Sequence, residues 1–159
     1  MRTVRPKRSF RFAIWSLISS TVSIWSILAI TNWFGHSLLI GSFGATAVLL
    51  FAVPEAPLSQ PRNLIGGHLI SATIAVILVA IFGTNFFTIG FSVGLSIFVM
   101  YLTHTLHPPG GATALIGVIG GVGIDFIIFP VLIGVLILLV NALVVNNFVH
   151  HRKYPVVWF

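Results

Sequence analysis

The sequence predicts an all-α integral membrane protein built from two inverted repeats of three helical segments each. The first observation is composition: of 159 residues, 57% are hydrophobic and only 6% are charged, and the mean hydropathy is +1.10. So few charges cannot keep a soluble domain dispersed, so the chain is expected in a lipid bilayer. The second observation is the order of the apolar segments, which runs long, short, long, and then again long, short, long.

The first apolar run, residues 12–31, is uncharged and, at about twenty residues, long enough to cross a bilayer. It follows five of the eight basic residues, namely Arg2, Arg5, Lys7, Arg8 and Arg11. A basic cluster beside an apolar run is a cytoplasmic anchor under the positive-inside rule. No basic face with interleaved aromatics occurs elsewhere, which excludes nucleic acid as a partner. We expect a retained helix here rather than a cleaved signal peptide, because no clean small-residue cleavage site follows.

The remaining segments complete two repeats, at about 12–82 and 86–149, within a single transmembrane domain, 1–159. After a break at 32–41, the segment 42–53 is too short for an ordinary span. A proline-rich loop (54–63) precedes the next span, 64–82. In the second repeat, the run 86–101 leads to a short segment at 112–121 and a last span at 126–148.

Two short sequence matches suggest that the repeats arose by duplication. Gly-Ala-Thr-Ala occurs at 44–47 and again at 111–114. Leu-Ile-Gly occurs at 64–66 and again at 132–134, one residue out of register with the first match. Three crossings in each half would make the halves inverted in the membrane, as in many transporters.

The number of crossings fixes on which side the loop around Arg62 lies. With six crossings, both termini and this loop face the cytoplasm, as the positive-inside rule prefers. The alternative is four spans plus two re-entrant segments, which keeps both termini cytoplasmic but turns the loop outward. We favour six crossings, in a bacterial-type plasma membrane because no organellar transit peptide precedes the first span.

The candidate functional site is the stretch 103–114, which interrupts an apolar run with His104, His107, two prolines and two glycines. Proline removes a backbone donor and disfavours helix at the preceding residue, so His107 should be extended. A helix can then restart with Pro109 in its first turn. Within a membrane such a break is tolerated only where it is buried in protein or lines a polar cavity.

In an inverted pair, the two short helices would begin near the midplane with their N-termini facing each other. Each N-terminus exposes unpaired N–H groups and the positive end of the helix dipole, which together attract a small anion without a buried lysine or arginine. Glu55 and Asp125 lie at segment ends, which argues against a cation path. The predicted substrate-binding residues are Ser42, Phe43, Gly44, Ala45, Thr46, His104, His107, Gly110, Gly111, Ala112 and Thr113.

Within that set, Thr46 and Thr113 supply hydroxyl donors, and Gly110 and Gly111 allow close backbone approach. His107 is expected to fix the loop by a hydrogen bond or to contact the anion, and a proton relay is open to it because imidazole titrates near neutral pH. A metal site at His104 and His107 is disfavoured, because the prolines prevent a regular helix there and His68 has no evident place beside them.

Several functions are excluded or expected from the rest of the chain. With no cysteine, disulfides and thiolate chemistry are absent. No nucleophile–base–acid set occurs, so an enzyme is not expected, and no cofactor is implied. A chain this short offers little protein around a midplane site, so we expect a homo-oligomer.

Three sequence blocks stand out: Leu-His-Pro-Pro-Gly-Gly-Ala-Thr-Ala at 106–114, Gly-Ser-Phe-Gly-Ala-Thr-Ala at 41–47 and Gln-Pro-Arg-Asn-Leu-Ile-Gly-Gly-His at 60–68. In this order they resemble the HPP family of small integral membrane proteins. The resemblance covers about 12–148. The family is usually described with four spans, against the six crossings favoured above. Some bacterial relatives add a soluble C-terminal regulatory domain, which we do not expect in a chain ending at Phe159.

The resemblance also implies a substrate, because family members in plant chloroplasts and cyanobacteria are associated with nitrite transport. Nitrite therefore comes from the resemblance alone. Nitrate, formate, bicarbonate or chloride would satisfy the same helix-terminus site. A rival of another class is a non-transporting membrane scaffold or sensor subunit.

Overall fold

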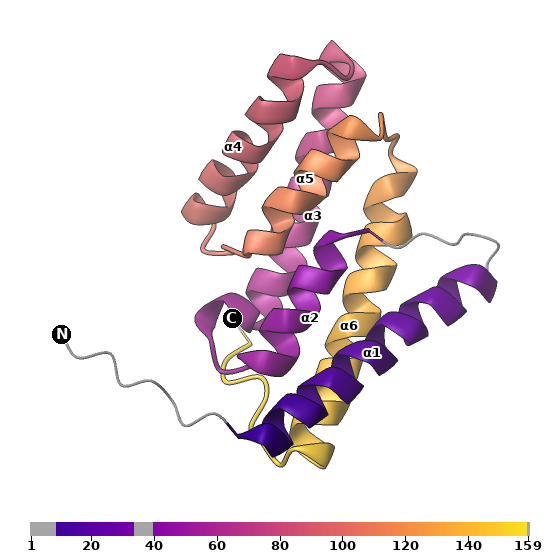
Figure 1. The fold of residues 1–159 in the computed structure, drawn as a ribbon. Helices are drawn as coiled ribbons and strands as arrows, with labels where there is room; N and C mark the ends of the chain where they lie inside the picture. The colour runs from indigo at the N-terminus through magenta and orange to yellow at the C-terminus, as the bar shows by residue number, and fades with distance from the viewer. Residues whose placement is uncertain (1–8, 34–39, 159) are drawn as a thin grey trace.

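The computed structural model describes residues 9–33 and 40–158, and its regular structure there is entirely helical (Figure 1). The basic residues before Ser9 and most of the break before the first short segment lie outside the described residues. In chain order the elements are α1 (Phe10–Trp33), α2 (Ser42–Ala52), the 3₁₀ turn η1 (Pro57–Ser59), α3 (Pro61–Phe82), α4 (Phe86–Leu102), α5 (Pro108–Ile119), the π-helical turn η2 (Ile127–Leu132), α6 (Ile133–Val144) and the π-helical turn η3 (Val145–Val149).

The predicted all-α membrane architecture is confirmed, but the predicted order of long and short segments is confirmed only in part, because Phe86–Leu102, expected to be long, is one of the shorter helices. Three helices are long and apolar enough to cross a membrane, at Phe10–Trp33, Pro61–Phe82 and Ile127–Val149, and three shorter apolar helices lie between them. One boundary differs, because α5 begins at Pro108 rather than near Ala112. Its first two positions are prolines, and a helix start is where the missing N–H is tolerated.

The two repeats are inverted with respect to each other. α1 packs against α2 and α6, and α4 packs in the corresponding way against α5 and α3. In Figure 1, α2 and α5 begin near the centre of the view and run away from each other, α2 downward and α5 upward. This arrangement is the one that a duplicated three-helix unit gives when its copies are related by a two-fold axis in the membrane plane.

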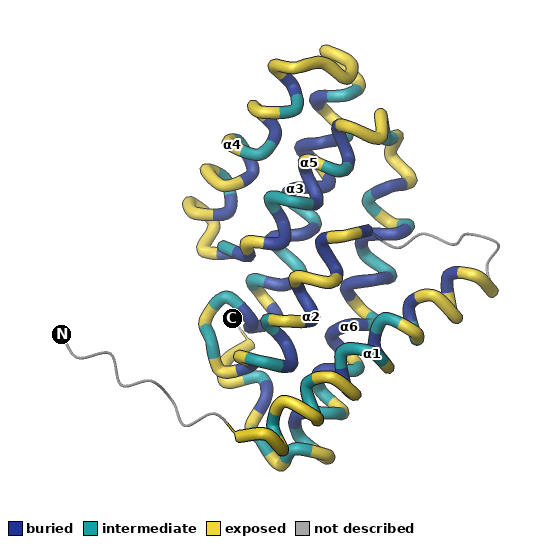
Figure 2. Tube along the Cα trace, in the orientation of Figure 1, coloured by how far each residue is buried: buried dark blue, intermediate teal, exposed yellow. Residues whose placement is uncertain are grey.

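The outer helices α1 and α4 carry matching stripes of buried residues at every fourth position, which is one face of a helix. In α1 these residues are Ser19, Ser23, Ile27 and Thr31, and in α4 they are Thr88, Ser92, Ser96 and Met100. Most of the remaining surface of both helices is apolar and exposed (Figure 2). Small polar residues inside and large apolar residues outside are typical of helices that pack together in lipid.

The proline-rich loop lies on the same face of the molecule as both ends of the described chain. The Tyr154 hydroxyl donates to the carbonyl of Ser59 at 2.8 Å. Near the other end, the Arg152 guanidinium lies 4.0 Å from the centre of the Phe12 ring. The loop and the ends of the described chain therefore share one side, as expected for six crossings. The re-entrant alternative would place the loop and the termini on opposite sides.

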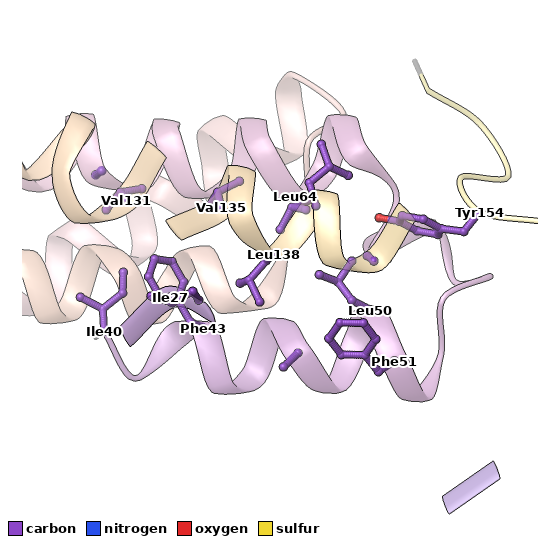
Figure 3. Close-up of a cluster of buried hydrophobic side chains, with 14 of the residues drawn as sticks. Ile27, Ile40, Phe43, Leu50, Phe51, Leu64, Val131, Val135, Leu138 and Tyr154 are labelled. Carbon is purple, nitrogen blue, oxygen red and sulfur yellow. The ribbon is translucent and has the colours of Figure 1, made fainter. Parts of the chain in front are cut away.

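The apolar core lies mainly between α2 and the η2–α6 span (Figure 3). Phe43 and Leu50 of α2 face Val135 and Leu138 there, and all four side chains are fully buried. Phe43 also covers Gly134, where an added Cβ would lie 2.3 Å from the tip of the ring. On this side of the molecule, α2 is therefore held by a large ring over a glycine.

Candidate functional site

The starts of the two short helices meet in the interior. Ser42 is the first residue of α2, and its hydroxyl oxygen lies 2.9 Å from that of Thr113, in the second turn of α5. Neither residue is more than 1% exposed. The juxtaposition of the two helix starts that the inverted-repeat argument predicted is therefore present.

His68 of α3 lies between the two short helices. Its Nδ1 is 2.7 Å from the hydroxyl of Thr113 on α5, and its Nε2 is 2.8 Å from the hydroxyl of Thr46 on α2. The Phe43 ring packs against the imidazole, with 5.7 Å between ring centroids. A single imidazole thus bridges equivalent threonines of the two Gly-Ala-Thr-Ala segments.

His107 extends this contact toward the proline-rich loop. Its Nε2 lies 3.1 Å from the hydroxyl of Thr46, and its Nδ1–H donates to the carbonyl of Leu58 at 2.8 Å. The backbone at His107 is extended (φ −140°, ψ 104°), as the following proline predicted. The hydrogen bond to Leu58 is also the loop-fixing role expected for this histidine.

These contacts form one continuous series of hydrogen bonds, which we term the histidine–threonine chain: Ser42, Thr113, His68, Thr46, His107 and the Leu58 carbonyl. Its five side chains are buried. A buried polar group needs a partner, and here the groups satisfy one another in the interior of the helix bundle. The conformation is therefore closed, and a ligand would have to replace some of these bonds.

Close backbone contact between α3 and α5 holds the histidine–threonine chain in place. A Cβ added at Gly110 would lie 2.7 Å from the Gly67 carbonyl oxygen, and one at Gly67 would lie 2.5 Å from the Cβ of His107. Only glycine at both positions lets the helices approach this closely. Gly110 thus brings the start of α5, and with it His107, against α3.

The other predicted site residues lie outside the histidine–threonine chain. His104 is exposed, has a positive φ of 55°, and lines a surface pocket with Glu55 and Arg62. On α2, Gly44 faces a groove beside α1 and the neighbouring Ala45 is exposed. On α5, Gly111 and Ala112 line a groove beside α4.

The helix starts offer fewer amide donors than the sequence suggested. Pro108 and Pro109 have no N–H, and the N–H of Gly110 bonds to the carbonyl of His107 at 2.8 Å. In α2, the N–H of Phe43 bonds to the carbonyl of Ile40 at 3.0 Å. The polar groups that face one another are therefore mainly hydroxyls and imidazoles.

Sequence reasoning missed His68, the residue with the most central position. The available signal was a histidine within an otherwise uncharged span, because ionisable residues in membrane helices mark functional sites. The two glycines before it indicated close approach by another segment. The structure brings together His68 and His107, at 5.0 Å between ring centroids. Among the described residues, no three histidine or acidic side chains are grouped as metal ligands would be.

Comparisons with known proteins identify relatives of the whole transmembrane unit. The model of the HPP transmembrane region matches residues 5–155. One curated transmembrane protein of Dictyostelium discoideum is 53% identical over 129 residues, which cover 76% of this chain and 45% of that protein. Another from the same organism is 44% identical over 158 residues, covering 91% and 50%. The chain spans about half the length of these relatives, whose names describe them only as transmembrane proteins. No solved structure is significantly similar to the chain.

Proposed function

Because the chain belongs to the HPP transmembrane family, we propose that it carries a small monovalent anion, nitrite in the first place, across a lipid bilayer. The family resemblance supplies nitrite as the substrate. The observation that supports transport is the histidine–threonine chain, which places polar groups at the junction of two broken helices inside a membrane protein.

The contact between Ser42 and Thr113 is the proposed anion site. It lies where α2 and α5 meet, so a separation of these helices would open it without unfolding either repeat. The two hydroxyls and the imidazole of His68 could then donate to an anion instead of bonding to each other. Neutral donors bind an anion less strongly than a buried lysine or arginine, which favours its release on the other side.

The distribution of basic residues supports the expected orientation, in which both termini are cytoplasmic. All four described basic residues, Arg11, Arg62, Arg152 and Lys153, belong to the face that holds the proline-rich loop and the chain ends. Under the positive-inside rule, this face is cytoplasmic. Both termini are then cytoplasmic, in a plasma membrane of the bacterial type.

Flux into proteoliposomes tests the proposal. Purified protein is compared for uptake of nitrite, nitrate, formate and chloride, with Ser42→Ala and Thr113→Val as site variants. The matched control is Ser96→Ala, because the Ser96 hydroxyl is buried in α4 and has no hydrogen-bond partner among the described residues.

We expect nitrite uptake in the wild type and the control, and a loss of at least tenfold in the site variants. Uptake of a different anion with the same loss would retain the site and replace the substrate. Folded wild-type protein that carries none of the four anions would refute transport and favour a scaffold or sensor. The mass of the purified particle, measured by light scattering, tests the homo-oligomer that we also propose.

A further inference from the structure

We propose that the histidine–threonine chain is a proton relay, so that each anion crosses together with a proton. This inference rests on the proposed function for the identity of the cargo. The relay itself needs only the hydrogen-bonded side chains, and it can therefore be tested without any transported anion.

With both histidines neutral, one arrangement of hydrogens gives every ring nitrogen in the histidine–threonine chain a partner. It takes the hydroxyl hydrogens of Thr46 and Thr113 away from the carbonyls of Ser42 and Pro109, at 3.1 and 3.2 Å. A carbonyl only accepts, so Nδ1 of His107 carries the hydrogen that is donated to Leu58, at 2.8 Å. Its Nε2 is then an acceptor and needs a donor, and the hydroxyl of Thr46 is the group within reach, at 3.1 Å. Because a hydroxyl has one hydrogen, Thr46 has none left for His68.

His68 connects Thr46 to α5. Nε2 of His68 lies 2.8 Å from Thr46 and must donate to it, which leaves Nδ1 of His68 as an acceptor. In this arrangement Thr113 donates to that nitrogen at 2.7 Å, instead of to the Ser42 hydroxyl at 2.9 Å or the Pro109 carbonyl at 3.2 Å. Ser42 then supplies the hydrogen between the two hydroxyls. Every donor in the chain therefore points the same way, from Ser42 toward Leu58.

A series of donors with one direction transfers a proton without moving any heavy atom far. When Ser42 accepts a proton from hydronium or from the acid form of the anion, its own hydrogen passes to Thr113 and that of Thr113 passes to Nδ1 of His68. The Nε2 hydrogen of His68 then passes to Thr46, and the hydrogen of Thr46 passes to Nε2 of His107. His107 then gives up its Nδ1 hydrogen to a water that takes the place of the Leu58 carbonyl as its acceptor, so one proton enters and one leaves.

The transfer leaves both imidazoles in the opposite tautomer, and a second proton cannot follow until the rings turn over. Both rings are fully buried and packed between three helices, so this reset requires α2 and α5 to separate. The same separation would open the anion site. The relay therefore predicts one proton for each opening, and thus one proton for each anion.

The relay leads to a surface with groups that exchange protons. Its last acceptor, the Leu58 carbonyl, belongs to the loop whose neighbouring residues Pro57 and Gln60 line a pocket with Glu55, Arg62 and His104. No carboxylate, lysine or arginine among the described residues hydrogen-bonds to either buried ring. At the buried rings, the neighbouring titratable group is therefore the other histidine.

The test compares Thr46→Val with Thr46→Ser in proteoliposomes that contain a pH-sensitive dye. Valine keeps the shape but breaks the relay, whereas serine keeps the hydroxyl. Ser42→Ala breaks the relay at its end with a smaller change and serves if Thr46→Val does not fold, and Ser96→Ala is again the control. Protein-free liposomes correct for the acid form of the anion that crosses lipid unaided.

Proton movement is measured twice, during nitrite uptake and under a potassium diffusion potential without nitrite. The relay is supported by a ratio near one proton per nitrite, with proton movement lost at least tenfold in Thr46→Val or Ser42→Ala and kept in Thr46→Ser. Nitrite uptake without proton movement overturns the relay and keeps the proposed transport. Voltage-driven proton movement that needs Thr46, without uptake of any anion, supports the relay and rejects anion transport. Absence of both overturns both.

Discussion

The two repeats are built on one plan but are held together differently at equivalent positions. A constant offset of 67 relates Phe43 to Gly110 and Gly67 to Gly134. In the second repeat, Gly110 lets α5 touch the α3 backbone at Gly67, whereas in the first repeat the Phe43 ring covers Gly134 of α6. The α5–α3 junction brings backbone against backbone, and the α2–α6 junction packs the Phe43 ring against a glycine.

The polar groups show the same contrast. Thr46 and Thr113 are equivalent at this offset and both belong to the histidine–threonine chain. The positions equivalent to His107 and His68 are Ile40 and Val135, which are buried in the apolar core. The repeated frame therefore places a threonine on both sides of the junction, whereas the histidines line only one side of it. The path of hydrogen bonds leads toward the proline-rich loop, and the described residues form no counterpart toward the opposite face.

Cysteine labelling tests the inverted arrangement of the two repeats. It has the largest expected effect of any test, because each position is either labelled or not. Glu55 and Gly123 are both exposed and lie in turns at opposite ends of α3. The chain has no cysteine of its own. We expect Gly123→Cys, but not Glu55→Cys, to react with an impermeant maleimide added to intact cells. Labelling of both from the same side would remove the six-crossing inverted arrangement.

The two glycine junctions are expected to differ in their tolerance of a methyl group. Gly110→Ala should lower the free energy of unfolding by about 2–3 kcal/mol, because the added Cβ meets backbone that cannot yield. Gly134→Ala should lower the free energy of unfolding by about 1–2 kcal/mol, because the Phe43 ring can shift away from the added methyl group. Unfolding in detergent measures both. Phe43→Leu should rescue Gly134→Ala and leave Gly110→Ala unchanged, and rescue of both would mean that the junctions are alike.

The equivalent threonines should differ by a smaller amount. Thr46→Val leaves Nε2 of both histidines without a partner. Thr113→Val deprives Nδ1 of His68 and also the hydroxyl of Ser42, so it is combined with Ser42→Ala, and the double variant leaves only Nδ1 unpaired. A buried polar group left unpaired costs about 1–3 kcal/mol, so Thr46→Val should be the less stable by about that amount. The same unfolding assay decides this, and equal losses would argue that the chain is not continuous through Thr46.

Much of the fold could be predicted from the sequence, because span length, proline breaks and the position of basic residues are local signals. The meeting of Ser42, Thr46, His107 and Thr113 followed from the inverted repeat. His104 was grouped with His107 on spacing, but its positive φ turns it to the surface. His68 and the Leu58 carbonyl could not be assigned, because their partners lie 22 and 49 positions away in the chain. Such pairings depend on how the helices pack.

The C-terminal segment has a consequence for how the protein is made. Tyr154 binds the carbonyl of Ser59, and the backbone N–H of Val156 donates to the side chain of Gln60, 96 positions earlier. These contacts hold the loop whose carbonyl at Leu58 positions His107. Because Tyr154 follows all six helices in the sequence, these contacts can form only after α6 has been made. The buried histidines are therefore among the last parts to be fixed, and a nascent chain that stops before Tyr154 inserts without completing its centre.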